Sequence, residues 1–322
     1  MASLLSVENL QVQFQTKKGI NTAVDGVSFS VEKGRILGIV GESGCGKSVT
    51  SMSILQLLGS NARISGGSIK LDGKELIGLP EKEMCRIRGN DIAMIFQDPM
   101  TALNPTLTIG TQLMEPIMLH QNCGKKEAWT RAVDVLKRVG IAAPEKRMKE
   151  YPHQLSGGMR QRVMIAMAVS CEPRLLIADE PTTALDVTIQ AQILELMCEL
   201  REKMGTAIML ITHDMGVVAE TADDVLVLYA GKAVEYGSIE DIFERPKHPY
   251  TQGLLNSIPR LDEDVELLNT IEGTVPAPDA MPAGCRFAPR CPYGKDRCMK
   301  EKPGVYHAGN SLVSCFRYAG EK

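Results

Sequence analysis

The sequence predicts an α/β fold organised around a phosphate-binding loop. Between residues 174 and 231, apolar stretches of strand length alternate with stretches of helical periodicity, a pattern typical of a mostly parallel sheet covered by helices. Upstream, the octapeptide GESGCGKS at 41–48 separates an apolar stretch, 36–40, from a stretch with helical periodicity. A glycine-rich turn between a buried strand and a helix N-terminus is suited to binding phosphate.

Length and composition limit the class of protein. The chain has 322 residues, of which 44% are hydrophobic, so it is long enough for one large domain with an appendage or for two domains. Its net charge of −3 and isoelectric point of about 6.0 give no basic surface for nucleic acid. No apolar stretch approaches the roughly 18 residues of a membrane helix, and the N-terminus lacks a signal-peptide pattern. We therefore expect a cytosolic protein without a nucleic-acid partner.

Short strands are predicted for the first eighty residues, and helices for the region after them. Alternating or apolar stretches bounded by glycines place the strands at 5–14, 22–32, 36–40 and within 64–80. From about residue 104 to 169 the periodicity is helical, with one helix at 127–141 and a second beginning after Ser156.

Strands and helices then alternate up to residue 231. The expected elements are a strand at 174–180, a helix at 187–205, a strand at 206–214, a helix at 216–222 and a strand at 224–231. After about residue 245 the pattern changes, because nine of the 17 prolines lie in 246–322 and regular periodicity is lost. We expect an irregular C-terminal extension there.

The loop at 41–48 matches the pattern of Gly, four free positions and Gly-Lys-Ser. Its glycines let backbone N–H groups turn toward a polyphosphate, Lys47 is long enough to reach the β and γ phosphates, and the Ser48 hydroxyl suits Mg²⁺. The predicted nucleotide-binding residues are Gly41, Glu42, Ser43, Gly44, Cys45, Gly46, Lys47 and Ser48. A chance glycine-rich turn is the alternative, and the strand–loop–helix context disfavours it.

A second motif completes the nucleotide site. The apolar stretch LLIADE at 175–180 ends in two acids, of which Asp179 is predicted to hold Mg²⁺ through water and Glu180 to orient or deprotonate the attacking water. The alternative is a buried strand that ends in solvated acids.

Three further stretches make the assignment specific. They are QLSGGMRQR at 154–162, Gln97 within MIFQDP, and His213 within LITHD. With ALD at 184–186, these motifs resemble the full set of the ATP-binding-cassette (ABC) ATPases over at least residues 5–240. The resemblance implies a RecA-like phosphate-loop core with an N-terminal antiparallel β subdomain and a helical subdomain at about 100–165, together forming a domain at 1–245.

The resemblance also assigns roles to individual residues. Ser156, Gly157 and Gly158 open a helix and, in this family, contact the ATP held by the opposite subunit, so that ATP lies between two chains. The alternative is a Gly-Gly helix start without a ligand. Gln97 resembles the residue that contacts Mg²⁺ or the attacking water and senses the membrane partner, and the alternative is an exposed loop glutamine.

The resemblance points to three further residues of the nucleotide site. His213 resembles the histidine that contacts the γ-phosphate and positions Glu180, and a buried structural histidine is the alternative. Asp186 resembles an acid in the loop that crosses the dimer interface. Phe14 is either the aromatic that stacks on adenine or a core residue.

Cys45 lies within the phosphate loop, at a helix N-terminus, where a thiol can have a lowered pKa. We assign it no catalytic role, but we expect alkylation of this thiol to block ATP binding sterically.

The flanking sequences indicate the branch of the family. The stretches at 96–110, 151–168 and 178–193, with 247–259 and 273–298 in the tail, resemble ATPase subunits of dipeptide and oligopeptide importers. The resemblance implies an ATP-hydrolysing subunit at the cytoplasmic face of the membrane, working with two integral membrane permeases, a homologous ATPase chain as heterodimer partner and, indirectly, an extracytoplasmic solute-binding protein. The rival class is a non-transport ABC ATPase acting on ribosomes or nucleic acid, and an adaptor with a degenerate site is disfavoured by the intact motifs.

Four cysteines cluster in the extension at 246–322. They are spaced C-x5-C-x6-C-x16-C and are Cys285, Cys291, Cys298 and Cys315. In a reducing compartment such a cluster is typical of a metal site, and the spacing alone leaves an iron–sulfur cluster and zinc open. The importer group carries a [4Fe–4S] cluster on this pattern, so the resemblance favours iron–sulfur over Zn²⁺ or free thiols. Its expected role is to order a segment with little apolar content.

Overall fold

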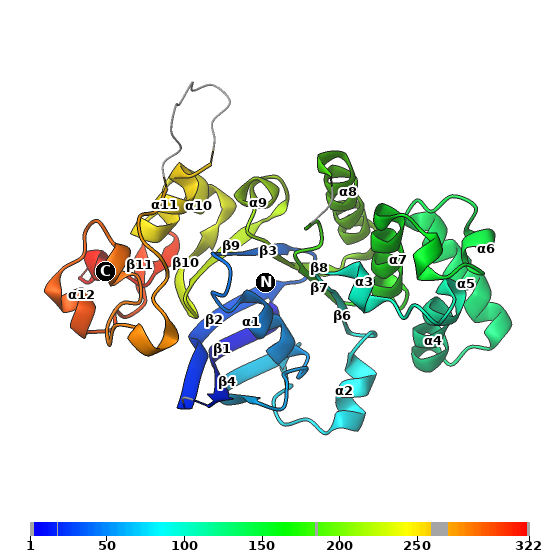
Figure 1. The fold of residues 1–322 in the computed structure, drawn as a ribbon, viewed down its shortest axis with the longest axis horizontal. Helices are drawn as coiled ribbons and strands as arrows, with labels where there is room; N and C mark the ends of the chain where they lie inside the picture. Colours follow the sequence, from blue (N-terminus) through cyan, green and yellow to red (C-terminus); the bar gives the residue numbers. More distant parts are fainter. Residues whose placement is uncertain (1–2, 18, 184–185, 259–269, 321–322) are drawn as a thin grey trace. The chain divides into compact units, whose positions relative to one another are not determined.

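The computed structural model describes residues 3–17, 19–183, 186–258 and 270–320 (Figure 1). The chain divides into two compact units. The first consists mainly of Gly78–Ile211, and the second mainly of Leu5–Ser30, Ile36–Ile77 and the segment from Thr212 to the C-terminus. The boundary expected at residue 245 remains a prediction, since the second unit includes residues on both sides of it.

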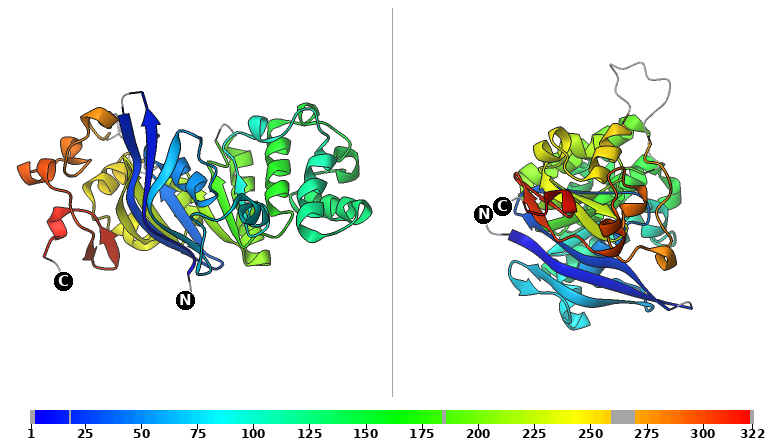
Figure 2. Two further views of the ribbon diagram at one scale, coloured as in Figure 1. Left: turned by 90° about the horizontal axis from the view of Figure 1, so that it is seen from below. Right: turned by 90° about the vertical axis from the view of Figure 1, so that its left-hand side faces the viewer.

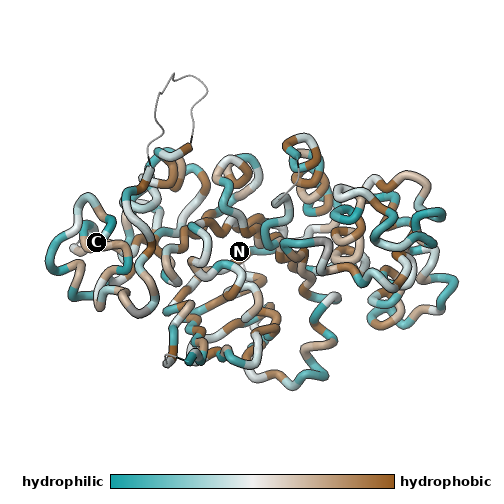
Figure 3. The backbone as a smooth tube through the Cα atoms, in the orientation of Figure 1, coloured by the Kyte–Doolittle hydropathy of each residue, from teal (hydrophilic) through white to brown (hydrophobic). Residues whose placement is uncertain are grey.

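Parallel strands form the sheet of the first unit. Strand β7 (Leu175–Asp179) lies between β6 (Ile92–Ile95) and β8 (Ala207–Ile211) and pairs with both in parallel. Every residue of β7 and β8 is buried, as expected for strands covered on both faces, and the central strands are hydrophobic in Figure 3. Helix α8 (Val187–Met204) joins β7 to β8 and ends at Gly205 in the left-handed conformation.

The helical part of the first unit lies between β6 and β7 in the chain. It contains α3 (Pro99–Ala102), α4 (Ile109–Gln121), α5 (Lys125–Arg138), α6 (Pro144–Arg147) and α7 (Gly157–Val169). Helices α4, α5 and α7 pack against one another, while α2 (Glu81–Ile87) precedes β6 (Figure 1). Helix α5, expected at 127–141, packs through one apolar face, on which Ala128, Ala132 and Leu136 are fully buried.

The second unit has an antiparallel sheet of order β2-β1-β4-β5. Its strands are β1 (Ser3–Thr16), β2 (Gly19–Glu32), β4 (Ala62–Leu71) and β5 (Lys74–Glu75). The long strands β1 and β2 lie side by side in Figure 2. The pairing of β1 with β4 is irregular between Glu8 and Gln11, where Asn9 has a φ of 48°.

The remaining strands of this unit bring the C-terminal segment onto the core. Strand β3 (Ile36–Val40) pairs in parallel with β9 (Asp224–Tyr229), which pairs antiparallel with β10 (Lys232–Ser238). The short hairpin of β11 (Tyr306–Ala308) and β12 (Ser311–Val313) continues this sheet through the pairing of β12 with β10.

In its described residues, this unit also contains five α-helices. They are α1 (Lys47–Ile54), α9 (Met215–Thr221), α10 (Ile239–Glu244), α11 (Pro249–Asn256) and α12 (Asp296–Lys300). The expectation of an irregular extension after residue 245 is therefore wrong for α11 and for the β11–β12 hairpin. Over the described residues, no helix combines the length and apolar character that crossing a bilayer requires.

Candidate active site

The phosphate loop connects β3 to α1 in the second unit, as the sequence predicts. Two glycines are required by its geometry: a Cβ on Gly41 would lie 2.1 Å from the Leu228 carbonyl oxygen, and Gly46 has a φ of 101°. Gly46 is the N-cap of α1, and Ser48 in the first turn is exposed. The loop thus presents a helix N-terminus without an acidic residue in its first turn, which favours an anion.

Lys47 folds back into the loop. Its side chain is buried, and Nζ donates hydrogen bonds to the carbonyl oxygens of Gly41 at 2.7 Å and Glu42 at 3.2 Å. These bonds hold the ammonium group inside the turn that the glycines shape. A phosphate group in this turn would meet a positive charge whose position the backbone already determines.

The Cys45 thiol does not have the lowered pKa that its position at a helix N-terminus suggests. The Cys45 side chain is 3% exposed, and burial raises the pKa of its thiol despite the nearby Lys47 ammonium. We therefore expect alkylation of this thiol to be slow in the folded protein. The steric effect of alkylation on ATP binding remains a prediction.

A hydrogen-bonded arrangement surrounds Glu180 in the first unit. The Gln97 Nε2 atom donates to Glu180 Oε2 at 2.9 Å, and the Thr183 hydroxyl donates to the same oxygen at 3.0 Å. Gln97 and Glu180 meet because β6 and β7 are parallel neighbours, with Ile95 opposite Ala178, so that both residues leave the same edge of the sheet. The two donors orient the carboxylate.

Glu180 lies in a tight turn directly after a buried acid. Asp179, the last residue of β7, is buried at 4% exposure, and Glu180 has a φ of 48°, an uncommon value for a residue with a side chain. No sequence motif singles out Thr183, although its position three residues after the acid places its hydroxyl within reach of the carboxylate in a turn. The backbone N–H of Thr183 donates to the Glu180 carbonyl at 3.2 Å and closes that turn.

The LSGGM stretch starts α7 in the first unit, as predicted. The exposed Ser156 is its N-cap, and its hydroxyl accepts a hydrogen bond from the Met159 backbone N–H at 3.4 Å. Among the described residues, no atom lies within 4 Å of a Cβ built on Gly157. This helix end is therefore open to a ligand or partner.

Three further predicted residues, His213, Asp186 and Phe14, lie on or next to separate elements. His213 is exposed after β8, so the alternative of a buried structural histidine is wrong. Asp186 accepts a hydrogen bond from the Ile189 backbone N–H at 2.9 Å and caps α8, while Ala184 and Leu185 lie outside the described residues. Phe14 on β1 is only partly buried, so it is not a core residue. Phe14, the phosphate loop and His213 belong to the second unit, and the other predicted nucleotide-site residues to the first.

The four cysteines of the extension come together in the second unit. All four line one cavity of about 80 Å³. Burial raises the pKa of Cys285 to about 11, and the neighbouring thiols add to this effect. Within 3–17, 19–183, 186–258 and 270–320, however, no three Cys, His, Asp or Glu side chains are close enough to share a single metal ion. The thiols thus surround a common space without the tight grouping that one ion requires.

Comparisons with known proteins agree with this geometry. The family described as "ABC transporter" matches residues 24–183, which include the phosphate loop, Gln97, the LSGGM stretch and Glu180. The family described as "Oligopeptide/dipeptide transporter, C-terminal region" matches residues 234–298, which include three of the four clustered cysteines. Cys315, Asp186 and His213 lie outside both matches.

Relatives and solved structures cover most of the chain. It is 56% identical to the oligopeptide transport ATP-binding protein AppD of Bacillus subtilis, over 100% of this chain and 98% of the relative. It is 52% identical to the oligopeptide transport ATP-binding protein OppD of Escherichia coli, over 98% of this chain and 93% of the relative. The dimeric structure of MJ0796, a bacterial ABC transporter cassette, is 28% identical with a TM-score of 0.66, over 73% of this chain and 98% of that one. The chain therefore belongs to the ABC transporter family, within its oligopeptide and dipeptide transport ATP-binding proteins.

Proposed function

We propose that this chain is the ATP-hydrolysing subunit of an importer of dipeptides, oligopeptides or a related solute. The observation that carries the proposal is the carboxylate of Glu180, held at the end of a buried strand by Gln97 and Thr183, in a chain whose phosphate loop contains a folded-in lysine. The similar proteins are oligopeptide and dipeptide transport ATP-binding proteins, and they indicate the class of solute that is transported.

The proposed reaction is hydrolysis of the bond between the β and γ phosphates. Loop N–H groups and Lys47 bind the polyphosphate, and Phe14 stacks on adenine. The oxygen of a water molecule attacks the γ-phosphorus as the bond to the bridging oxygen breaks, and the Glu180 carboxylate accepts a proton from that water. The products are ADP and inorganic phosphate, and the exposed His213 contacts the γ-phosphate.

The chain also offers ligands for Mg²⁺. The hydroxyl of Ser48, the amide oxygen of Gln97 and the carboxylate of Asp179 are hard oxygen donors, the type that this ion prefers. When bound, Mg²⁺ neutralises charge on the β and γ phosphates.

The proposed site is shared between two chains. The open start of α7 suits the γ-phosphate of ATP bound to a partner, with Ser156, Gly157 and Gly158 as contacts and Asp186 near the interface. One solved relative, the ATP-binding cassette MJ0796, is a dimer in a post-hydrolysis state bound to ADP and Pi. The partner is a homologous ATPase, in a heterodimer that sits on two integral membrane permeases at the cytoplasmic face of the membrane. An extracytoplasmic solute-binding protein delivers the solute to those permeases.

Purification of the tagged full chain from the organism that encodes it tests the proposal. We expect two integral membrane proteins and a second ATPase chain to copurify, and the complex in proteoliposomes to accumulate a labelled tripeptide when ATP is supplied with the binding protein. A matched preparation with a nonhydrolysable ATP analogue should accumulate none. Copurification with ribosomes or nucleic acid instead of membrane proteins would support the rival class and refute the transport proposal.

The cysteine cavity completes the proposal. We propose that Cys285, Cys291, Cys298 and Cys315 hold a [4Fe–4S] cluster that orders the extension. A zinc ion with bonds of about 2.3 Å would draw its four sulfurs together, whereas thiols around a cavity of about 80 Å³ suit a larger group.

Replacing Cys291 by serine is expected to remove visible absorbance and most of the iron from protein purified without oxygen. Cys198, outside the cavity, provides a matched control, and Cys198→Ser should keep both signals. The unfolding temperature of Cys291→Ser should fall by several degrees, because a cluster that binds the folded state stabilises it. Stoichiometric zinc without iron in the unsubstituted protein would overturn the assignment.

A further inference from the structure

The second residue of the phosphate loop, Glu42, is held by two residues of the C-terminal segment. The Arg290 Nη1 atom donates to Glu42 Oε1 at 2.9 Å and to Oε2 at 3.0 Å. The Glu42 backbone N–H donates to the Tyr250 hydroxyl at 2.9 Å. All three residues belong to the second unit. We propose that Arg290 and Tyr250 are positioning residues of the phosphate loop, and that Arg290 neutralises Glu42 so that the loop accepts a nucleotide polyphosphate.

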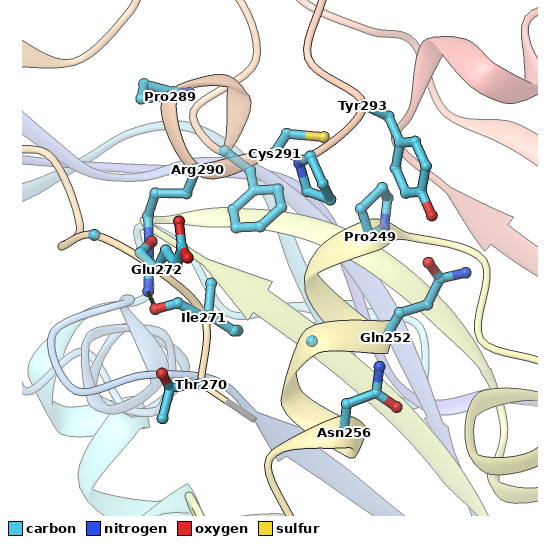
Figure 4. Close-up of a pocket in the computed structure, with 14 residues that line it drawn as sticks. Pro249, Gln252, Asn256, Thr270, Ile271, Glu272, Pro289, Arg290, Cys291 and Tyr293 are labelled. Carbon is cyan, nitrogen blue, oxygen red and sulfur yellow. Dashed lines mark hydrogen bonds between the residues drawn. The ribbon is translucent and has the colours of Figure 1, made fainter. Parts of the chain in front are cut away.

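The Arg290 side chain is buried and held in one orientation. It is 6% exposed, its Nε donates to the Glu272 carbonyl at 3.0 Å, and its Nη2 donates to the Ile271 carbonyl at 3.2 Å. Figure 4 shows the side chain extending toward this segment, at one wall of a cavity of about 730 Å³. The Tyr229 hydroxyl lies 3.4 Å from Nη1, and the Tyr229 ring centroid lies 5.8 Å from the guanidinium carbon. The ion pair with Glu42 is therefore an ordered one, unlike most surface pairs.

Tyr250 is fixed by aromatic packing. It is fully buried, and its ring centroid lies 4.7 Å from that of Tyr229 and 5.4 Å from that of Phe287. Its backbone N–H donates to Nδ1 of the buried His248 at 3.1 Å, at the start of α11. The hydroxyl therefore reaches the Glu42 N–H from a rigid position.

The negative charge of Glu42 links its ion pair with Arg290 to nucleotide binding. A carboxylate within a phosphate-binding turn repels a polyphosphate, and this repulsion is strong where protein shields the charges from water. Lys47 contacts the backbone carbonyl of Glu42, and in the proposed function its charge binds the phosphates. Arg290 therefore supplies the positive charge that offsets the Glu42 carboxylate. The other reading is that the ion pair only attaches the extension to the core. The two readings differ in what removal of the Glu42 charge does.

A double-mutant cycle on the full chain tests this inference, which rests on the proposed function. The probe is a fluorescent ATP analogue, and the measurements are its Kd and the unfolding temperature of each variant. Arg290→Ala should raise the Kd on the order of tenfold in the unsubstituted background, because an unpaired carboxylate then faces the polyphosphate. In the Glu42→Gln background, Arg290→Ala should change the Kd by less than about twofold, since no carboxylate remains to be offset.

The control lies in the same extension. Arg297 forms an exposed ion pair with Glu301, and Arg297→Ala should leave the Kd unchanged. An Arg290→Ala protein that binds the probe as tightly as the unsubstituted one would overturn the inference. So would an equal loss in both backgrounds, which would mean that Arg290 acts by attaching the extension. Failure of the unsubstituted chain to bind the probe would instead contradict the proposed function itself.

Discussion

Replacing Glu180 by glutamine is expected to lower ATP turnover at least about 100-fold, while ATP binding is retained. Glutamine preserves the shape of the side chain and an oxygen for the Gln97 and Thr183 donors, but it does not accept a proton from water. The bound ATP should therefore persist and hold two ATPase chains together. Phosphate release and size-exclusion chromatography with ATP measure the two effects.

An exposed acid near the other end of the same strand provides the control. Glu172 pairs with Arg138 at the surface, and Glu172→Gln should keep normal turnover. Turnover at the unsubstituted rate in Glu180→Gln would show that Glu180 is not the general base. A dimer that forms without slowed hydrolysis would contradict the proposed link between the two.

Replacing Lys47 by alanine is expected to weaken ATP binding about 100-fold, a larger loss of affinity than the one expected for Arg290→Ala. The change removes a buried ammonium that the Gly41 and Glu42 carbonyls already hold within the loop, so no other group takes its place without rearrangement. The Kd of a fluorescent ATP analogue measures the loss. It should far exceed the change expected for Arg290→Ala, because Lys47 contacts the phosphates and Arg290 acts through Glu42.

Lys137→Ala removes an exposed lysine from α5 and should bind ATP normally. Thermal unfolding of both variants separates loss of affinity from loss of structure. Tight ATP binding by a folded Lys47→Ala protein would mean that the loop is not the phosphate site.

Two central elements of the first unit are predicted closely by the sequence. The sequence predicts a helix at 187–205, and α8 spans Val187–Met204. It predicts a strand at 174–180, and β7 spans Leu175–Asp179. Buried parallel strands are continuous apolar runs, and helices end where a glycine adopts the left-handed conformation, so short windows of sequence carry this information. The pairing of β12 with β10 was missed, because a three-residue strand has too little pattern to be seen.

The sequence by itself determined the residue types of the nucleotide site and the conformation of its loop. Gly41 and Gly46 are needed where a Cβ would collide or φ is positive, and these are local steric requirements. The tertiary structure alone decided which distant side chains meet. Register between β6 and β7 brings Gln97 to Glu180, and burial of aromatic rings brings Arg290 to Glu42, 248 residues away in the chain. Such contacts depend on packing between elements, which no local pattern of the chain specifies.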